Sequence, residues 1–69
     1  MMFSEFQEWL YGNRNMFNEV PDTLALSPED FSELVDCVMH LCTEEERESV
    51  KRNGWMELLK VRVVEWQIA

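Results

Sequence analysis

The chain has 69 residues, 46% of them hydrophobic, and a formal charge of −8 from fourteen acidic and six basic side chains. This length allows one domain with a small core, and the hydrophobic content is too high for a disordered tail. The negative charge disfavours direct binding to nucleic acid or to anionic membranes, because both repel it. A protein partner with a basic surface remains compatible with it.

The N-terminal sequence has neither the basic residues of a signal peptide nor a long apolar run. Acidic residues stand where a secretory signal carries Lys or Arg, and no segment approaches the roughly 18 apolar residues of a membrane span. We therefore expect a cytoplasmic protein. A chain of this size and charge is also typical of proteins encoded by phages and mobile elements.

Residues 4–12 are expected to form a short first helix. Ser4 and Gln7 have the spacing of a capping box, and apolar side chains recur around them at helical intervals. Gly12 is suited to end this helix in the left-handed conformation. The residues that follow, 13–26, are expected to be mostly loop, with a short extended piece near the end.

The clearest helix prediction covers residues 28–42. Ser27 can accept a hydrogen bond from a first-turn N–H, and Pro28 suits the first helical position. At about 100° per residue, one face of this helix is apolar and the opposite face is mostly acidic. The acidic stripe consists of Glu29, Glu33 and Asp36, followed by His40.

A further helix is expected at residues 44–53. Thr43 and Glu46 repeat the capping-box spacing, and Gly54 supplies a stop signal. Val50 is the only apolar residue in this segment, so most of the helix should face water.

The last fifteen residues fit either a helix or a strand. Four β-branched residues among the last nine favour a strand at 57–67, with a bulge at Val63 and Val64 that keeps its apolar side chains together. The only neighbour within the chain is the weak extended piece at 20–26, so a second molecule could supply a missing edge. The sequence thus predicts an α+β fold of three short helices and a C-terminal strand, with an all-α helical bundle as the alternative.

Cys37, His40 and Cys42 form a C-x-x-H-x-C pattern that superficially suggests a metal site. On one helix Cys42 points into the core, away from the other two, so the three cannot share one ion. The cysteines also point apart, and we expect two free thiols, with Cys42 buried. A chain of this size with two glycines has little room for a catalytic pocket. We therefore expect no metal, no cofactor and no enzymatic activity.

The feature with the sharpest functional interpretation is the segment 19–36, which contains six acids and no base. Carboxylates spaced along a helix can engage the Arg and Lys side chains of a nucleic-acid-binding protein, as a nucleic-acid mimic does. The alternative is a solvated face that only keeps a small protein in solution. Trp9 and Trp66 are expected mainly in the core, whereas an exposed Trp55 would mark a binding surface.

Two functions follow from these features. The first is a non-enzymatic acidic protein that regulates or inhibits a basic partner. The second is a structural or adaptor module that forms a homodimer, or joins a partner, through its C-terminal strand and Trp residues. The candidate partner-binding residues are Glu19, Asp22, Glu29, Asp30, Glu33, Asp36 and Trp55.

Overall fold

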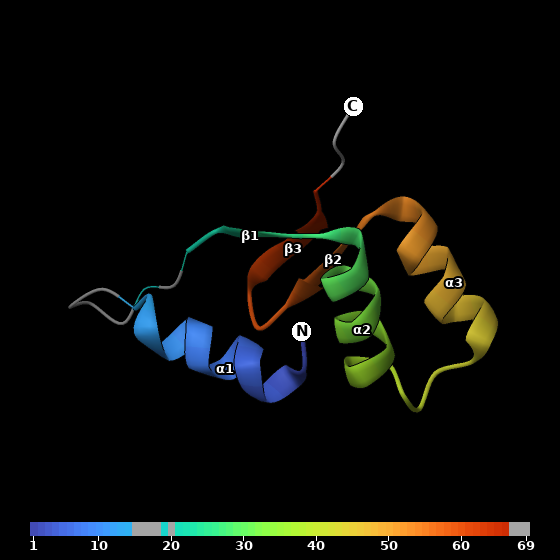
Figure 1. Ribbon diagram of the computed structural model, residues 1–69, viewed down its shortest axis with the longest axis horizontal. Helices are drawn as coiled ribbons and strands as arrows, with labels where there is room; N and C mark the ends of the chain where they lie inside the picture. Colours follow the sequence, from blue (N-terminus) through green and yellow to red (C-terminus); the bar gives the residue numbers. More distant parts are fainter. Residues whose placement is uncertain (15–18, 20, 67–69) are drawn as a thin grey trace.

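A computed structural model describes residues 1–14, 19 and 21–66. The elements along this part of the chain are α1 (Phe3–Gly12), β1 (Thr23–Leu26), α2 (Pro28–Val38), α3 (Glu44–Asn53), β2 (Trp55–Leu58) and β3 (Val61–Glu65) (Figure 1). The α+β prediction is confirmed, with three helices and a three-stranded mixed sheet among the described residues. The predicted loop positions 15–18 and 20, and the predicted strand end at 67, lie outside the described residues.

The sheet has the strand order β1-β3-β2. β3 runs parallel to β1 and antiparallel to β2, with Val63 opposite Leu24 on one side and opposite Met56 on the other. The C-terminal strand is therefore the centre of the sheet, and this chain already occupies both of its edges. A second molecule, which the sequence left open as a pairing partner for this strand, is therefore not needed to complete it.

The segment predicted as one strand at 57–67 is a hairpin of two strands. Leu59 and Lys60 form its turn, with φ values of 49° and 70°. Two successive residues with positive φ are typical of a type I′ turn, whose twist matches that of the flanking strands. The turn was not predicted from the sequence because Gly and Asn, which usually mark such a turn, are absent from both positions. Both ladders keep an unbroken register, so the predicted bulge at Val63 and Val64 is wrong.

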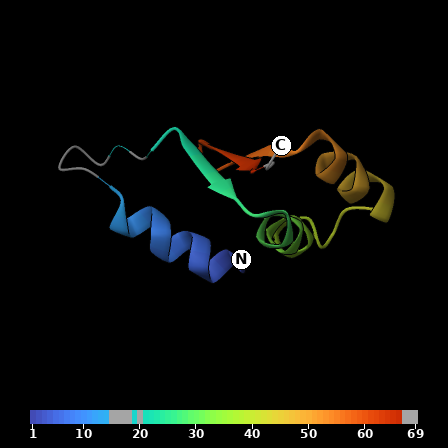
Figure 2. The same cartoon turned by 45° about the horizontal axis from the view of Figure 1, so that its top comes forward.

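One face of the sheet packs against α1 and α2 and forms the core. Figure 2 shows these two helices on the same side of the strands. Side chains alternate along a strand, so Val61 and Val63 of β3 point into this core, whereas Arg62 points out of it. The buried core consists of Phe6, Leu10, Leu26, Phe31, Leu34, Val35, Met56, Val61 and Val63.

The predicted starts of α2 and α3 are confirmed. The hydroxyls of Ser27 and Thr43 each accept a hydrogen bond, 3.2 Å long, from the backbone N–H three residues further on. Gly54 ends α3 in the left-handed conformation, at φ 77°. These side-chain caps satisfy backbone donors that the first turn of a helix leaves free.

The ends of α1 differ from the prediction. The helix begins at Phe3, and the Glu5 carboxylate accepts a hydrogen bond of 3.1 Å from the N–H of Met2. The predicted cap at Ser4 is therefore wrong, because Ser4 is already inside the helix. Gly12 is also helical, and the chain leaves the helix at Asn13 with an ordinary negative φ of −110°.

α2 ends at Val38, four residues before the predicted end. Arg47 of α3 donates hydrogen bonds to the carbonyls of Cys42, at 2.8 Å, and Met39, at 3.4 Å. Because a cation from α3 satisfies carbonyls in this turn, the chain can leave the helix without orphaned acceptors. Leu41, which lies within the predicted helix but beyond the observed one, is consequently 89% exposed. No helix in the described ranges has the length and apolar character needed to cross a membrane.

Candidate protein-interaction surface

The sheet face opposite α1 and α2 is not covered by these helices (Figure 2). The strand register places every second side chain of each strand on this face, and these side chains are exposed or half-buried. The N–H of Trp66, just beyond β3, still donates to the carbonyl of Leu26, so the alternation continues onto this residue. We call this surface the open face: it consists of Thr23, Ala25, Trp55, Glu57, Arg62, Val64 and Trp66.

Trp55 and Arg62 form a stacked pair on the open face. The guanidinium carbon of Arg62 lies 5.1 Å from the centre of the Trp55 ring, and Trp55 is 49% exposed. An exposed cation–π contact of this kind contributes about 0.5–1 kcal/mol. The pair therefore holds a large aromatic side chain at the surface, which is the condition under which Trp55 was predicted to mark a binding surface.

A shallow hollow of about 230 Å³ opens beside this pair. Its walls are formed by Asp22, Trp55, Glu57, Lys60 and Arg62. Glu57 and Arg62 are directly opposite each other on adjacent strands, a position that favours a cross-strand ion pair. None of the ion pairs among the described residues joins the two carboxylates to the two cations around the hollow. The hollow thus combines an aromatic ring with four charges that do not neutralise one another through direct pairs.

The hairpin turn places one of these charges. Lys60 lies in the left-handed region, as does its neighbour Leu59, whose side chain is 53% exposed. For residues other than Gly this conformation costs about 1 kcal/mol or more, because Cβ approaches the backbone. The two flanking strands impose the turn, and it places Lys60 among the residues that line the hollow.

The acidic residues predicted along α2 are mostly engaged within the chain. Asp36 lies 2.8 Å from Nζ of Lys51 and 3.6 Å from Nε of Arg47, so two bases of α3 neutralise it. These ion pairs join α2 to α3. Asp36, the third residue of the predicted acidic stripe, is therefore paired within the chain.

The N-terminal ammonium group takes up two further carboxylates. It lies 2.7 Å from Oε1 of Glu33 and 3.2 Å from Oδ1 of Asp30. Desolvation lowers the pKa of the ammonium group, but the hydrogen bonds and negative charges of Glu33 and Asp30 outweigh it, and the pKa rises above its ordinary value of 8.0. Of the three members of the acidic stripe, only Glu29 therefore lacks an ion pair among the described residues.

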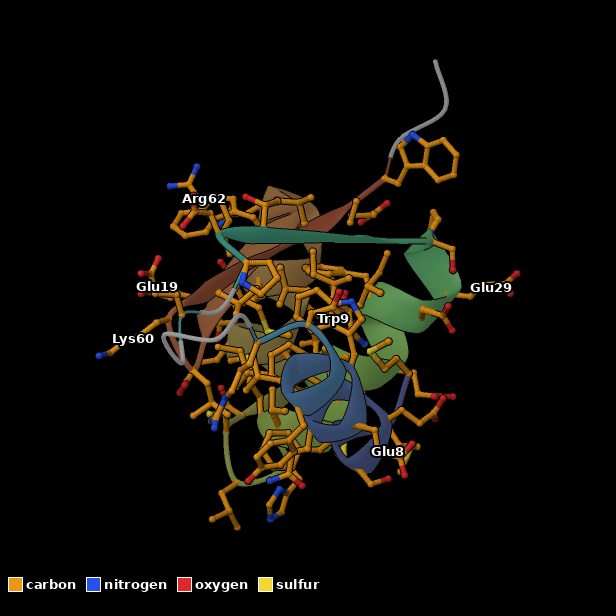
Figure 3. All side chains as sticks on the ribbon, turned by 90° about the vertical axis from the view of Figure 1, so that its left-hand side faces the viewer. Glu8, Trp9, Glu19, Glu29, Lys60 and Arg62 are labelled. Carbon is orange, nitrogen blue, oxygen red and sulfur yellow. The ribbon has the colours of Figure 1, made fainter. Side chains whose placement is uncertain are left out.

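The seven predicted partner-binding residues do not share one surface. Figure 3 shows Glu19 on the same side of the molecule as Lys60 and Arg62, and Glu29 on the opposite side. The structure brings Asp22 and Trp55 together at the hollow. Sequence reasoning missed the other three residues of the hollow, because their meeting depends on the hairpin turn that it did not detect.

The other two Trp residues lie in different environments. Trp9 packs against the core as predicted, with its ring 5.8 Å from that of Phe6. Trp66 is 62% exposed, so its predicted place in the core is wrong. Its side chain extends the open face because β3 is central and its inner side is already filled by Val61 and Val63.

The pattern of cysteines and histidine forms no shared site in the structure. Cys37 and Cys42 are free thiols, and both are half-buried, so Cys42 is less buried than predicted. Nδ1 of His40 lies 3.1 Å from the carbonyl oxygen of Cys37, at the end of α2. In the described part of the chain, no three side chains of His, Cys, Asp or Glu are grouped so that they could hold a metal ion.

The fold and this surface define a small α+β protein with one covered and one open sheet face. Comparison with protein-family models, curated proteins and solved structures gives no match.

Proposed function

We propose that this is a non-enzymatic binding protein that docks a basic protein partner on its open face. The observation that carries the proposal is the exposed Trp55–Arg62 pair on a sheet face that α1 and α2 leave uncovered. Trp residues are enriched among the few residues that dominate interface energetics. A rigid sheet also presents them without the ordering cost of a flexible loop.

The charge of the chain determines the kind of partner. A formal charge of −8 attracts a positively charged surface and speeds its association. The same charge repels a second copy of this chain, so we favour a different, basic protein over a homodimer. Binding alone would regulate such a partner: a protein that covers a basic, nucleic-acid-binding surface inhibits it, as the sequence-based mimic hypothesis requires.

The proposed contact surface differs from the one predicted from the sequence. Asp30, Glu33 and Asp36 already have cationic neighbours, and a partner would have to compete with them. The charges around the hollow have no such ion pairs among the described residues. Desolvation and competition therefore favour the open face as the docking surface, with the acidic surface of α2 contributing long-range attraction.

Two variants with the same fold separate these surfaces. The open-face variant carries Trp55→Thr and Trp66→Ser, and the α2 variant carries Glu29→Gln, Glu33→Gln and Asp36→Asn. Each protein is immobilised and exposed to lysate of the cells that encode it, and bound proteins are quantified by mass spectrometry at low and high salt. Circular dichroism confirms that both variants are folded.

We expect the wild type to capture a basic protein. The captured amount of that protein should be at least about ten-fold lower on the open-face variant, as for the loss of interface hot spots. The α2 variant should retain it, with a weaker association than the wild type at low salt and an equal one at high salt, where the long-range attraction is screened. Loss on the α2 variant alone would overturn the proposal and return the binding site to the acidic helix. Equal retention by all three proteins would overturn both assignments, and sedimentation as a dimer through the open face would identify a second copy as the occupant.

A further inference from the structure

We propose that the hollow beside Trp55 receives an arginine side chain of the partner. This inference rests on the proposed function and specifies the chemistry that the open face recognises. The incoming guanidinium would take the place of the Arg62 guanidinium over the Trp55 ring and would donate hydrogen bonds to the carboxylates of Asp22 and Glu57.

The molecule itself shows that this ring accepts a guanidinium. Arg62 is stacked on Trp55 at 5.1 Å, although Glu57 is directly opposite it in the ladder and available as an ion-pair partner. In this structure the guanidinium contacts the ring, and no ion pair among the described residues joins it to Glu57. This intramolecular contact is weak and exposed, so a cation that reaches both the ring and the carboxylates can displace it.

The size of the hollow fits one side chain. Its volume of about 230 Å³ is below the range of roughly 300–1,000 Å³ that is typical of pockets for drug-sized ligands and cofactors. Its walls provide an aromatic surface together with two acceptors, Asp22 and Glu57. A planar guanidinium can stack and donate in a fixed fork, whereas a lysine ammonium is a compact point charge.

An anionic ligand is the main competing assignment, because Lys60 and Arg62 also line the hollow. The field of a chain with a charge of −8 opposes the approach of an anion. Arg62 is moreover engaged with the ring, and Lys60 lies at the tip of the hairpin. The observations thus favour a cationic occupant that uses the two carboxylates.

The test uses the whole protein and three short probes of defined sequence. Acetylated, amidated (Gly-Arg)₃, (Gly-Lys)₃ and (Gly-Glu)₃ peptides are titrated into ¹⁵N-labelled protein, and the three Trp indole N–H signals are followed by NMR. The spectrum of the Trp55→Phe variant assigns the Trp55 signal. We expect the arginine peptide to shift that signal and to bind about three-fold more tightly than the lysine peptide. Only a guanidinium can both stack on the ring and donate two hydrogen bonds in a fixed planar geometry. The glutamate peptide should leave it unchanged.

Three variants distinguish the hollow from general attraction. Asp22→Asn with Glu57→Gln should weaken binding of the arginine peptide at least about five-fold, because both acceptors lose their charge. Glu8→Gln with Glu29→Gln removes the same charge from residues that lie apart from Lys60 and Arg62 in Figure 3, and it should weaken binding less than about two-fold. Arg62→Gln removes the internal competitor and should strengthen binding about two-fold or more.

Equal weakening by the two charge-matched variants would overturn the inference in favour of non-specific attraction. If the glutamate peptide binds and Arg62→Gln abolishes that binding, the hollow is an anion site and the inference is overturned. The proposed function has a separate failure: if the captured partner is lost on the open-face variant but not on Asp22→Asn with Glu57→Gln, the docking surface stands and the arginine pocket does not.

Discussion

The outer surface of α2 and the open face of the sheet both carry charged side chains, but they use them differently. On α2, Asp36 is bound to Arg47 and Lys51, and two further carboxylates hold the N-terminal ammonium group. On the open face, the charges around the hollow lie beside an exposed aromatic ring and do not pair with one another. The α2 surface is thus largely satisfied within the chain, whereas the open face is not.

Charge density along a sequence therefore does not by itself locate a binding surface. The segment 19–36 has six acids and no base, yet its helical part serves to attach α3 and the N-terminus. The hollow on the open face has two carboxylates and two cations, which come from β2, β3, the hairpin turn and the residue that precedes β1. Whether the charges find partners inside the chain, and not how many there are, separates the two surfaces.

The largest effect should come from comparing two adjacent valines of β3 that point to opposite faces. Val63 is fully buried, whereas Val64 lies half-buried on the open face. Val63→Ala should lower the free energy of unfolding by about 2 kcal/mol or more, because it leaves a cavity in the core. Val64→Ala should cost less than about 1 kcal/mol. Urea denaturation followed by Trp fluorescence measures both.

A domain of this size retains only about 3–5 kcal/mol of net stability, so Val63→Ala should be close to unfolding at room temperature. Equal losses for the two variants would show that the outer face is covered, for example by a second copy of the chain. Sedimentation of each variant at the concentration used for denaturation distinguishes that case from a monomer with an open face.

The second prediction concerns the hairpin tip at the edge of the open face. Replacing Leu59 by Asn and Lys60 by Gly should stabilise the fold by about 1 kcal/mol, since these residues adopt the left-handed conformation at lower cost. The melting temperature should rise accordingly. Lys60→Gln alone is the matched control: it removes the charge and keeps the strain, so it should leave the melting temperature nearly unchanged. A loss of stability in the Asn-Gly variant would contradict the turn assignment.

The hairpin also shows how far the sequence could be interpreted. Caps at Ser27, Thr43 and Gly54 act through neighbouring backbone atoms, and their positions were predictable. The turn at Leu59 and Lys60 is imposed by the pairing of β2 and β3, so local preferences did not reveal it. The hollow depends on that turn and on the parallel pairing of β1 with β3. It therefore required the tertiary structure, although its aromatic residue, Trp55, was recognised from the sequence.

The third prediction tests whether the α2 surface is held by its own ion pairs. Asp36→Asn should lower the free energy of unfolding by about 0.5 kcal/mol, because the pairs with Lys51 and Arg47 are partly exposed and screened by water. The loss should disappear at about 1 M salt, where the Debye length is near 3 Å. Glu29→Gln, on the same helix but without an ion pair among the described residues, is the control and should show no comparable salt-dependent loss. Equal effects would indicate that α2 is governed by its net charge.

The smallest effect should come from the other contact on α2, the N-terminal ammonium group with Glu33 and Asp30. Its pKa is raised above 8.0 in the folded chain, so protonation favours the fold. The stabilisation should be fully present below pH 8.0 and should decline as the pH rises through the higher pKa of the folded state. Thermal melts from pH 7 to pH 10 of the 69-residue chain with a free amino group should show this decline. An N-terminally acetylated chain should lack it, because acetylation removes the titrating charge. If both forms respond alike to pH, the ammonium contact does not stabilise this surface, and the carboxylates of Asp30 and Glu33 would be as available to a partner as those at the hollow.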